Sequence, residues 1–487
     1  MNKKKDDKVV VKLKKEYLSS ERIENKYKNI CLVLTICLIV CIVIISIISI
    51  GVGSDLISSD SSSEKAREIK NIMKGQWVYG DDYEDLEGTL DEQMFYGMTS
   101  FEEDPYTTYM SADDMDYFSN SIDKIQLGIG ISYYMEYNGY PYVLEVYKDS
   151  GAYNGGMKKG DRITSIDGHS AYNITDEDIK EYVLGDEGTY VEIGVQRGSQ
   201  DLLINCERKV FDSTACAELR GDVVVLTISS FGTDTAHTVS NELKDYTNYH
   251  KLIIDLRDNT GGYQDSLLEI AGLFLKNDTL VMKEIDKNDR ETSFYAKYGE
   301  HYYNFDHIII ITNENTASAA EVFAICMKEQ HNNTTLVGQE TFGKGVVQTS
   351  YRLSDGSYLK VTISYWTSPN GVPLNDGGIK PDIEIPLDDA FYFTKYVFED
   401  NDKYVYDSVS PYVTHSQLML KYLDYPVGRT DGYFDKDFET ALNMFKKDNS
   451  LNEDGVLDKE SFEKIYDSFY ECSKDEQLSE ALRLINE

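Results

Sequence analysis

The chain has 487 residues, too many for one compact hydrophobic core, so we expect several domains. Its formal net charge of −37 excludes nucleic acid as a partner, because phosphate binding requires clustered lysine and arginine. Its 7 cysteines and 7 histidines form neither a C-x-x-C pair nor a mixed cluster, so the sequence predicts no metal and no cofactor.

The N-terminus consists of a basic tail, residues 1–28, and an apolar segment, residues 29–53. Positions 30–52 carry no charge, and about 23 helical residues span roughly 35 Å, enough to cross a bilayer. A cleavable signal peptide is the main alternative, but its apolar region would be only about 7–15 residues long. We therefore expect an uncleaved transmembrane anchor in the cell membrane. Positive charge before the anchor places the N-terminus in the cytoplasm and the rest of the chain outside.

The exterior part begins with polar residues 54–63, which include the run SSDSSS and predict a solvated linker. Residues 64–124 repeat apolar side chains at helical spacing, which predicts a helical N-terminal region. This region contains the turn-rich hexapeptide DPYTTY at 104–109. The exterior part is thus expected to start with helices.

Short β-rich runs replace the helical pattern over residues 125–210. The tripeptide Gly128-Ile129-Gly130 precedes a strand and could leave backbone N–H groups free for a carboxylate, and GDRITSIDG contains an Asp-Gly turn. In this order the runs resemble a PDZ domain, which binds the C-terminus of a peptide as an added strand. An unrelated small β domain is the alternative.

Strands alternate with helices over residues 211–390, as in an α/β domain. The apolar runs 252–256 and 308–312 are of the buried-strand type, and a turn and a helical pattern follow each of them. Chemistry is common at such strand-to-helix corners, so reactive residues are expected there.

The tail contains a repeated Asp-Gly turn followed by a helical pattern within residues 411–472, and residues 473–487 form a C-terminal extension. A calcium loop is excluded because its first and twelfth ligand positions would be Ser450 and Ser461 rather than acids. The repeat predicts a small helical domain.

Ser318 stands at the second of these corners, before a predicted helix and between two alanines. There its hydroxyl would stand clear of the backbone, and the next amide, that of Ala319, would point toward a developing oxyanion. An ordinary N-cap serine would show the same local pattern.

Lys344 is the best candidate for a general base, because the spacing of the histidines singles none of them out. Gly343 and Gly345 flank it and permit its ammonium to be buried. As a base it must be neutral, so its pKa must fall from about 10.4 to roughly 7–8 through desolvation. An exposed lysine in a glycine-rich turn is the alternative.

Four segments resemble, in order and spacing, the C-terminal processing peptidases, also called tail-specific proteases. These segments are DLRDNTGG at 255–262, NENTASAAE at 313–321, GQETFGKGVVQ at 338–348, and LKVTISYWTSPNG at 359–371 with GIKPDI at 378–383. The tail similarly resembles a peptidoglycan-binding domain, although Phe445-Lys446 replaces the frequent Phe-Gln, so a protein-interaction module is the alternative.

By position, the resemblance implies Ser318 as nucleophile, Lys344 as general base and Gln348 as the residue that holds the lysine. Peptide hydrolysis would proceed through an acyl-enzyme. Two residues depart from the frequent family pattern: Ala320 replaces Ser, and Leu184 replaces an Arg. The implied oxyanion hole consists of backbone N–H groups, those of Ala319 and of either Gly261 or Gly262.

The sequence thus predicts an α/β and α+β multidomain protein with a transmembrane helix, a helical N-terminal region, a PDZ β domain, an α/β serine-protease core and a small helical C-terminal domain. The predicted function is that of a membrane-anchored extracytoplasmic serine endopeptidase whose substrates are proteins with accessible C-termini. Peptidoglycan is a further expected partner, and the oligomeric state, a homodimer included, stays open. A non-catalytic scaffold that links a PDZ ligand to the cell wall is the alternative function, but it predicts loss of Ser318 or Lys344, and both are present.

Overall fold

The computed structural model describes residues 61–136, 139–297, 302–374, 377–391, 398, 402–472 and 475–487. The chain divides into two compact units, Met1–Met98 and Thr99–Glu487. The predicted anchor lies outside the described residues, and no helix within them is long and apolar enough to cross a membrane.

The first unit is helical, as predicted. It contains α2 (Ser61–Gln76), the short 3-10 helix η1 (Gly80–Asp82) and most of α3 (Leu86–Thr99). The helix α2 begins at Ser61, so the predicted linker is wrong over its last residues; Glu64 in the first turn favours a helix start there.

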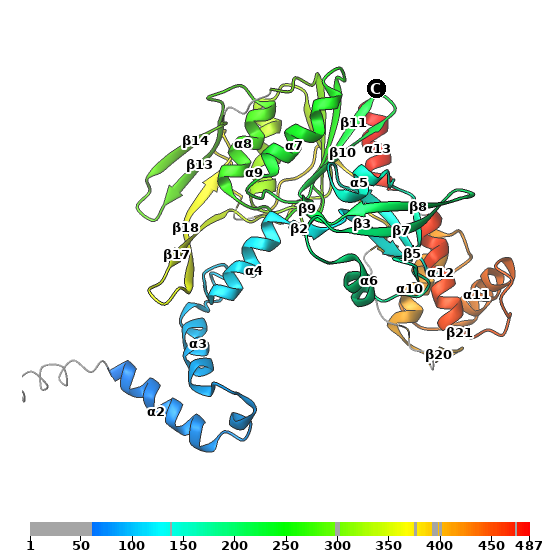
Figure 1. The fold of residues 1–487 in the computed structure, drawn as a ribbon, viewed down its shortest axis with the longest axis horizontal. Helices are drawn as coiled ribbons and strands as arrows, with labels where there is room; N and C mark the ends of the chain where they lie inside the picture. Colours follow the sequence, from blue (N-terminus) through cyan, green and yellow to red (C-terminus); the bar gives the residue numbers. More distant parts are fainter. Residues whose placement is uncertain are drawn as a thin grey trace, which may run out of the picture. The chain divides into compact units, whose positions relative to one another are not determined.

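The second unit contains a six-stranded sheet in the order β10-β11-β12-β15-β16-β19. Figure 1 labels its first two strands, β10 and β11. Neighbouring strands from β11 to β19 are parallel, and β10 is an antiparallel edge strand, which confirms the predicted α/β class. The strands are β10 (Ala215–Arg220), β11 (Val223–Ile228), β12 (Lys251–Asp255), β15 (His307–Thr312), β16 (Thr334–Gly338) and β19 (Ile383–Glu384).

Both faces of this sheet are covered, so its strands are apolar at consecutive positions. One face packs on α7 (Thr235–Leu243), α8 (Gln264–Phe274) and α9 (Ala319–Gln330). The other face packs on α13 (Glu476–Leu484), which lies within the predicted C-terminal extension and is drawn in red in Figure 1. The residues of this second interface include Val223, Val225, Ile253, Ile309, Ile311, Val337, Ala481 and Ile485.

A second sheet has the order β1-β18-β13-β14, with β17 paired to β18. Its strand β1 (Thr108–Met110) comes from the segment that was predicted to be turn-rich and helical. Pairing with β18 brings the DPYTTY segment into the protease domain, a long-range contact that local spacing does not indicate. The other strands are β13 (Leu280–Asp286), β14 (Glu291–Tyr295), β17 (Val346–Arg352) and β18 (Tyr358–Thr367), and α4 (Ala112–Asp123) follows β1.

The predicted PDZ region forms a sheet in the order β3-β4-β5-β7-β8, with β6 paired to β5. Asp167 and Gly168, both at positive φ, make the predicted turn between β5 and β6. Its elements are β3 (Ile131–Met135), β4 (Pro141–Val146), α5 (Gly151–Gly155), β5 (Arg162–Ile166), β6 (His169–Ser170), α6 (Asp176–Val183), β7 (Tyr190–Arg197) and β8 (Gln200–Glu207). The strands β2 (Ile125–Gly128) and β9 (Lys209–Asp212) pair with each other at the two ends of this region.

The C-terminal helical domain lies, in sequence, between β19 and α13. Its core joins α10 (Pro411–Tyr422), α11 (Lys436–Asp448) and α12 (Lys459–Cys472), as the repeat predicted. It is therefore an insertion into the protease domain, since the chain returns to the central sheet after α12. Two short strands, β20 (Lys403–Tyr404) and β21 (Leu457–Asp458), pair within it.

Candidate active site

Ser318 occupies the N-cap of α9, where the chain turns sharply after β15. Its backbone has φ 57° and ψ −121°, a conformation that is costly for a residue with a side chain, by about 1–3 kcal/mol. Such strain persists only where neighbouring contacts impose it, and it is common at reactive residues. The conformation favours a nucleophile over an ordinary N-cap serine, whose backbone is usually extended.

Glu321 supplies the contacts that hold this turn. Its carboxylate is fully buried, and Oε2 accepts hydrogen bonds from the backbone N–H groups of Ser318 at 2.8 Å and of Lys344 at 2.9 Å. Its Oε1 accepts from the N–H of Gly343 at 2.8 Å and from the Thr341 hydroxyl. One carboxylate oxygen thus fixes the backbones of both predicted catalytic residues.

The amine of Lys344 lies in a desolvated position. Burial, assisted by the positive charge of Lys360 and opposed by the negative charge of Glu321, lowers the pKa of Lys344 to about 8. Its Nζ lies 4.8 Å from the centre of the Tyr106 ring, which comes from the DPYTTY segment. This environment leaves a substantial neutral fraction near pH 8, as a general base requires.

The backbone N–H groups near Ser318 differ in availability. That of Gly261 donates to Asn259 Oδ1 at 2.9 Å and is therefore engaged. Within the described chain, Gly262 N–H has no acceptor, and Ala319 N–H belongs to the unsatisfied first turn of α9. Gly261 must be glycine, because its φ is 102° and a Cβ there would lie 2.8 Å from the Cβ of Ser318.

The side chain of Gln348 is hydrogen-bonded to Thr362. Its Nε2 donates to the Thr362 hydroxyl at 3.4 Å, and no hydrogen bond joins it to Lys344, although both side chains are described. Thr362 in turn donates to Asp104 at 3.0 Å. Burial favours a raised pKa for Asp104, but its hydrogen bonds outweigh burial and lower the pKa.

Comparison with known proteins decides the family. The profile of peptidase family S41 matches residues 222–385, that of a PDZ domain residues 142–197, and that of a putative peptidoglycan binding domain residues 410–465. A probable CtpA-like serine protease of Staphylococcus epidermidis is 32% identical over 459 residues, which cover 91% of each chain. The chain belongs to peptidase family S41.

A second relative agrees with this assignment. The carboxy-terminal processing protease CtpB of Bacillus subtilis is 31% identical over 444 residues, covering 87% of this chain and 89% of that protein. Among solved structures, a photosystem II D1 C-terminal processing protease is 19% identical, with a TM-score of 0.36 and coverage of 66% of this chain and 92% of that one. The S41 assignment makes the chain a serine protease and confirms the predicted family, PDZ domain and peptidoglycan-binding domain.

Several residues that surround Ser318 and Lys344 in this S41 chain were not predicted from the sequence. Glu321 had a visible signal, because Ser318 and Glu321 have the spacing S-x-x-E of a capping box. Tyr106 and Lys360 had none, since each reaches Lys344 only through the fold. The local pattern therefore indicates the residue that holds the backbone of Ser318, but not the residues that surround the Lys344 amine.

The predicted peptide-binding residues of the PDZ domain, Gly128, Ile129 and Gly130, line an apolar groove. Gly130 has φ 80°, and a Cβ there would lie 2.2 Å from the Cβ of Ser150, so this position requires glycine. Leu184, which is half exposed, also lines the groove. The groove can thus accept an apolar side chain.

Proposed function

We propose that this protein is a membrane-anchored serine endopeptidase of the C-terminal processing type that acts outside the cytoplasm, with Ser318 as nucleophile and Lys344 as general base. The observation that carries the proposal is the shared carboxylate of Glu321, which holds the backbones of both residues beside a lysine whose pKa is lowered to about 8. A non-catalytic scaffold would have no need of this arrangement.

The reaction begins when the neutral amine of Lys344 takes the proton of the Ser318 hydroxyl, while Oγ bonds to the carbonyl carbon of the scissile peptide. The tetrahedral intermediate collapses, the C–N bond breaks, and the leaving nitrogen receives the proton from the Lys344 ammonium. Water, deprotonated by Lys344, then attacks the ester and releases the new carboxylate with Ser318 regenerated.

The oxyanion of the intermediate would accept hydrogen bonds from the N–H groups of Ala319 and Gly262. The free N–H of Gly262 supports this choice between the two candidate glycines, since that of Gly261 already donates to Asn259. Gly261 instead allows the loop to approach Ser318 closely. Donors of this kind stabilise charge only in the transition state and so raise kcat.

Substrates would be proteins with an accessible C-terminus, which the PDZ groove at Gly128, Ile129 and Gly130 would receive. The apolar lining of that groove supports binding of an apolar C-terminal side chain. The match to a peptidoglycan-binding domain supports the cell wall as a second partner, and the uncharged residues 30–52 support the membrane anchor.

Catalysis by Ser318 can be tested with the purified full chain and a protein substrate that has a free C-terminus. A fluorophosphonate should label the wild-type protein, and mass spectrometry should detect cleavage. Ser318→Ala should abolish both, whereas Ser354→Ala, in an exposed turn of the same domain, should change neither. Cleavage that survives Ser318→Ala would refute the assignment.

The membrane orientation needs a separate measurement. Protease added to intact protoplasts should digest the domains after residue 53, because the basic residues before the apolar segment favour a cytoplasmic N-terminus. Protection of those domains would contradict the proposed topology.

A further inference from the structure

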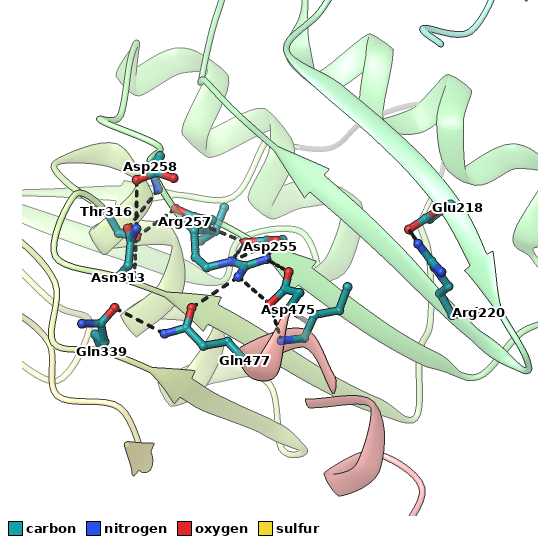
Figure 2. Close-up of polar contacts among 12 residues, drawn as sticks. Glu218, Arg220, Asp255, Arg257, Asp258, Asn313, Thr316, Gln339, Asp475 and Gln477 are labelled. Carbon is teal, nitrogen blue, oxygen red and sulfur yellow. Dashed lines mark hydrogen bonds and ion pairs between the residues drawn. The ribbon is translucent and has the colours of Figure 1, made fainter. Parts of the chain in front are cut away.

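The segment after the C-terminal helical domain returns to the protease domain at one particular residue. Asp475 is the N-cap of α13 and accepts a hydrogen bond from the N–H of Leu478 at 2.9 Å. The same carboxylate accepts two hydrogen bonds from Arg257, from Nη1 at 2.8 Å and from Nη2 at 2.6 Å (Figure 2). Two parallel bonds of this kind fix orientation as well as distance.

Arg257 lies between two carboxylates, as Figure 2 shows. Its Nε donates to Asp255 Oδ1 at 2.9 Å, and Nη2 donates to Asp255 Oδ2 at 2.5 Å. Asp255 is buried and ends β12, so the guanidinium is held on one side by the sheet and on the other by α13. Within the described residues, Asp475 therefore accepts two of the six hydrogen bonds that hold the side chain of Arg257; Asp255 accepts three and Gln477 Oε1 accepts one, at 3.3 Å.

The residues that follow Arg257 form the loop that contains the oxyanion candidates, residues 258–262. Asp258 has φ 59°, and its N–H donates to Asn313 Oδ1 at 2.9 Å. The carbonyl of Asn259 accepts from the N–H of Ala317 at 2.9 Å, directly before Ser318. Any displacement of Arg257 would thus act on a loop that is bonded to the nucleophile's own turn.

Helix docking alone does not explain the ion pair. Ala481 and Ile485 already pack against the apolar face of the sheet, and the side chain of Gln477 donates to the carbonyl of Ile385 at 2.9 Å. Burial of apolar surface supplies most of the favourable free energy when a helix docks on a sheet in this way. The two hydrogen bonds between Arg257 and Asp475 lie at the end of the interface next to the loop of residues 258–262. There they can fix the position of Arg257 rather than add to the affinity of α13 for the sheet.

We propose that Asp475 is a positioning residue for proteolysis: through Arg257 it holds the loop of Gly261 and Gly262 where the oxyanion forms. This inference rests on the proposed function, since it concerns the same reaction. On this proposal, the segment that follows the C-terminal helical domain supports the geometry of the active site. The two residues are 218 positions apart in sequence.

The test is steady-state cleavage by full-length Asp475→Asn, with Glu218→Gln as the matched control. Asparagine caps helices as well as aspartate does, so α13 keeps its cap. The ion pair with its two hydrogen bonds from Arg257 is lost. Glu218 pairs with Arg220 at 2.7 Å on the edge strand β10, and Figure 2 shows this pair away from the loop. Both variants remove one carboxylate charge from the same sheet region.

We expect Asp475→Asn to lower kcat by about tenfold with KM changed by less than about twofold, because an oxyanion donor acts in the transition state. Affinity for a peptide boronic acid, which forms a tetrahedral adduct with the serine, should fall by a similar factor. Asp475→Glu should restore most of the loss, and Glu218→Gln should match the wild-type protein.

Three results would overturn the inference: equal kcat in Asp475→Asn and Glu218→Gln, a rise in KM alone, or lower thermal stability with unchanged kcat and boronic acid affinity. If Asp475→Asn does not fold, Asp475→Ser decides, since serine also caps a helix but loses the paired hydrogen bonds to Arg257 and should lower kcat and inhibitor affinity together. Failure of the proposed function would differ, because wild-type protein would then show no Ser318-dependent cleavage at all.

Discussion

Two lysines in different domains have buried amines, and they differ in whether carboxylates pair with the amine. In the C-terminal helical domain, Lys446 is 2% exposed and its ammonium donates to Asp454 at 2.8 Å, with Asp458 at 3.9 Å. In the protease domain, Lys344 forms no ion pair within the described chain; its Nζ faces the Tyr106 ring.

The difference shows what distinguishes a structural charge from a base. The opposite charge of carboxylates at contact distance compensates the desolvation of a buried ammonium. Lys344 has a cation, Lys360, among its electrostatic neighbours, and the carboxylate among them, Glu321, already accepts hydrogen bonds from backbone N–H groups. Burial without a dedicated partner is therefore the feature that suits a lysine to proton transfer.

The largest expected effect comes from Lys344→Arg. A guanidinium cannot lose its proton near neutral pH, so cleavage should fall at least about 10³-fold although the charge and much of the size are kept. The measurement is kcat/KM on a C-terminally free substrate, together with thermal unfolding of the same preparation. An active arginine variant would remove Lys344 from the role of base.

Lys446 provides a control for that prediction, because it is a buried lysine with carboxylate partners. Lys446→Met should leave cleavage unchanged but lower the stability of the C-terminal helical domain by about 1–2 kcal/mol, because Asp454 and the carbonyl of Val456 lose their donor. Hydrogen exchange in α11 and α12 would report the loss. If Lys344→Arg and Lys446→Met lowered cleavage equally, the proposed difference in role between the two lysines would be wrong.

A smaller effect is expected from Lys360→Gln. Removing this positive charge should raise the pKa of Lys344, since Lys360 is one of the two causes that lower it. At pH 7 the neutral fraction of Lys344 should drop, and kcat/KM should fall about twofold to threefold. Lys380→Gln, at an exposed position of the same domain, is the control. A shift of the acidic limb to lower pH would contradict the electrostatic account.

Ser318 and Lys344 could be selected from the sequence as candidates because each lies in a short segment with its own signal. Ser318 follows a buried strand and precedes a helix, and Lys344 lies between glycines. The contact of Tyr106 with Lys344 depends on the pairing of β1 with β18, and that of Asp475 with Arg257 depends on the return of the chain after an inserted domain. Neither has a periodicity or a local motif to reveal it.

The fold was similarly predictable where hydrogen bonding is local and less so where it is distant. The alternation of strands and helices indicated the parallel sheet, and the Asp-Gly turns indicated the helices of the C-terminal domain. The strand β1 was missed because three residues in a turn-rich segment become a strand only through their partner. The residues of α13 were assigned only to a C-terminal extension, although its apolar residues complete the core of the sheet.

The most direct test of the lysine as general base is the pH dependence of kcat/KM for the wild-type protein. Lys344 must be neutral to accept the serine proton, so the rate should rise with pH through an apparent pKa of about 8 and then level off. An acidic limb at the pH of an ordinary histidine, or a rate that is already constant below pH 7, would contradict the account.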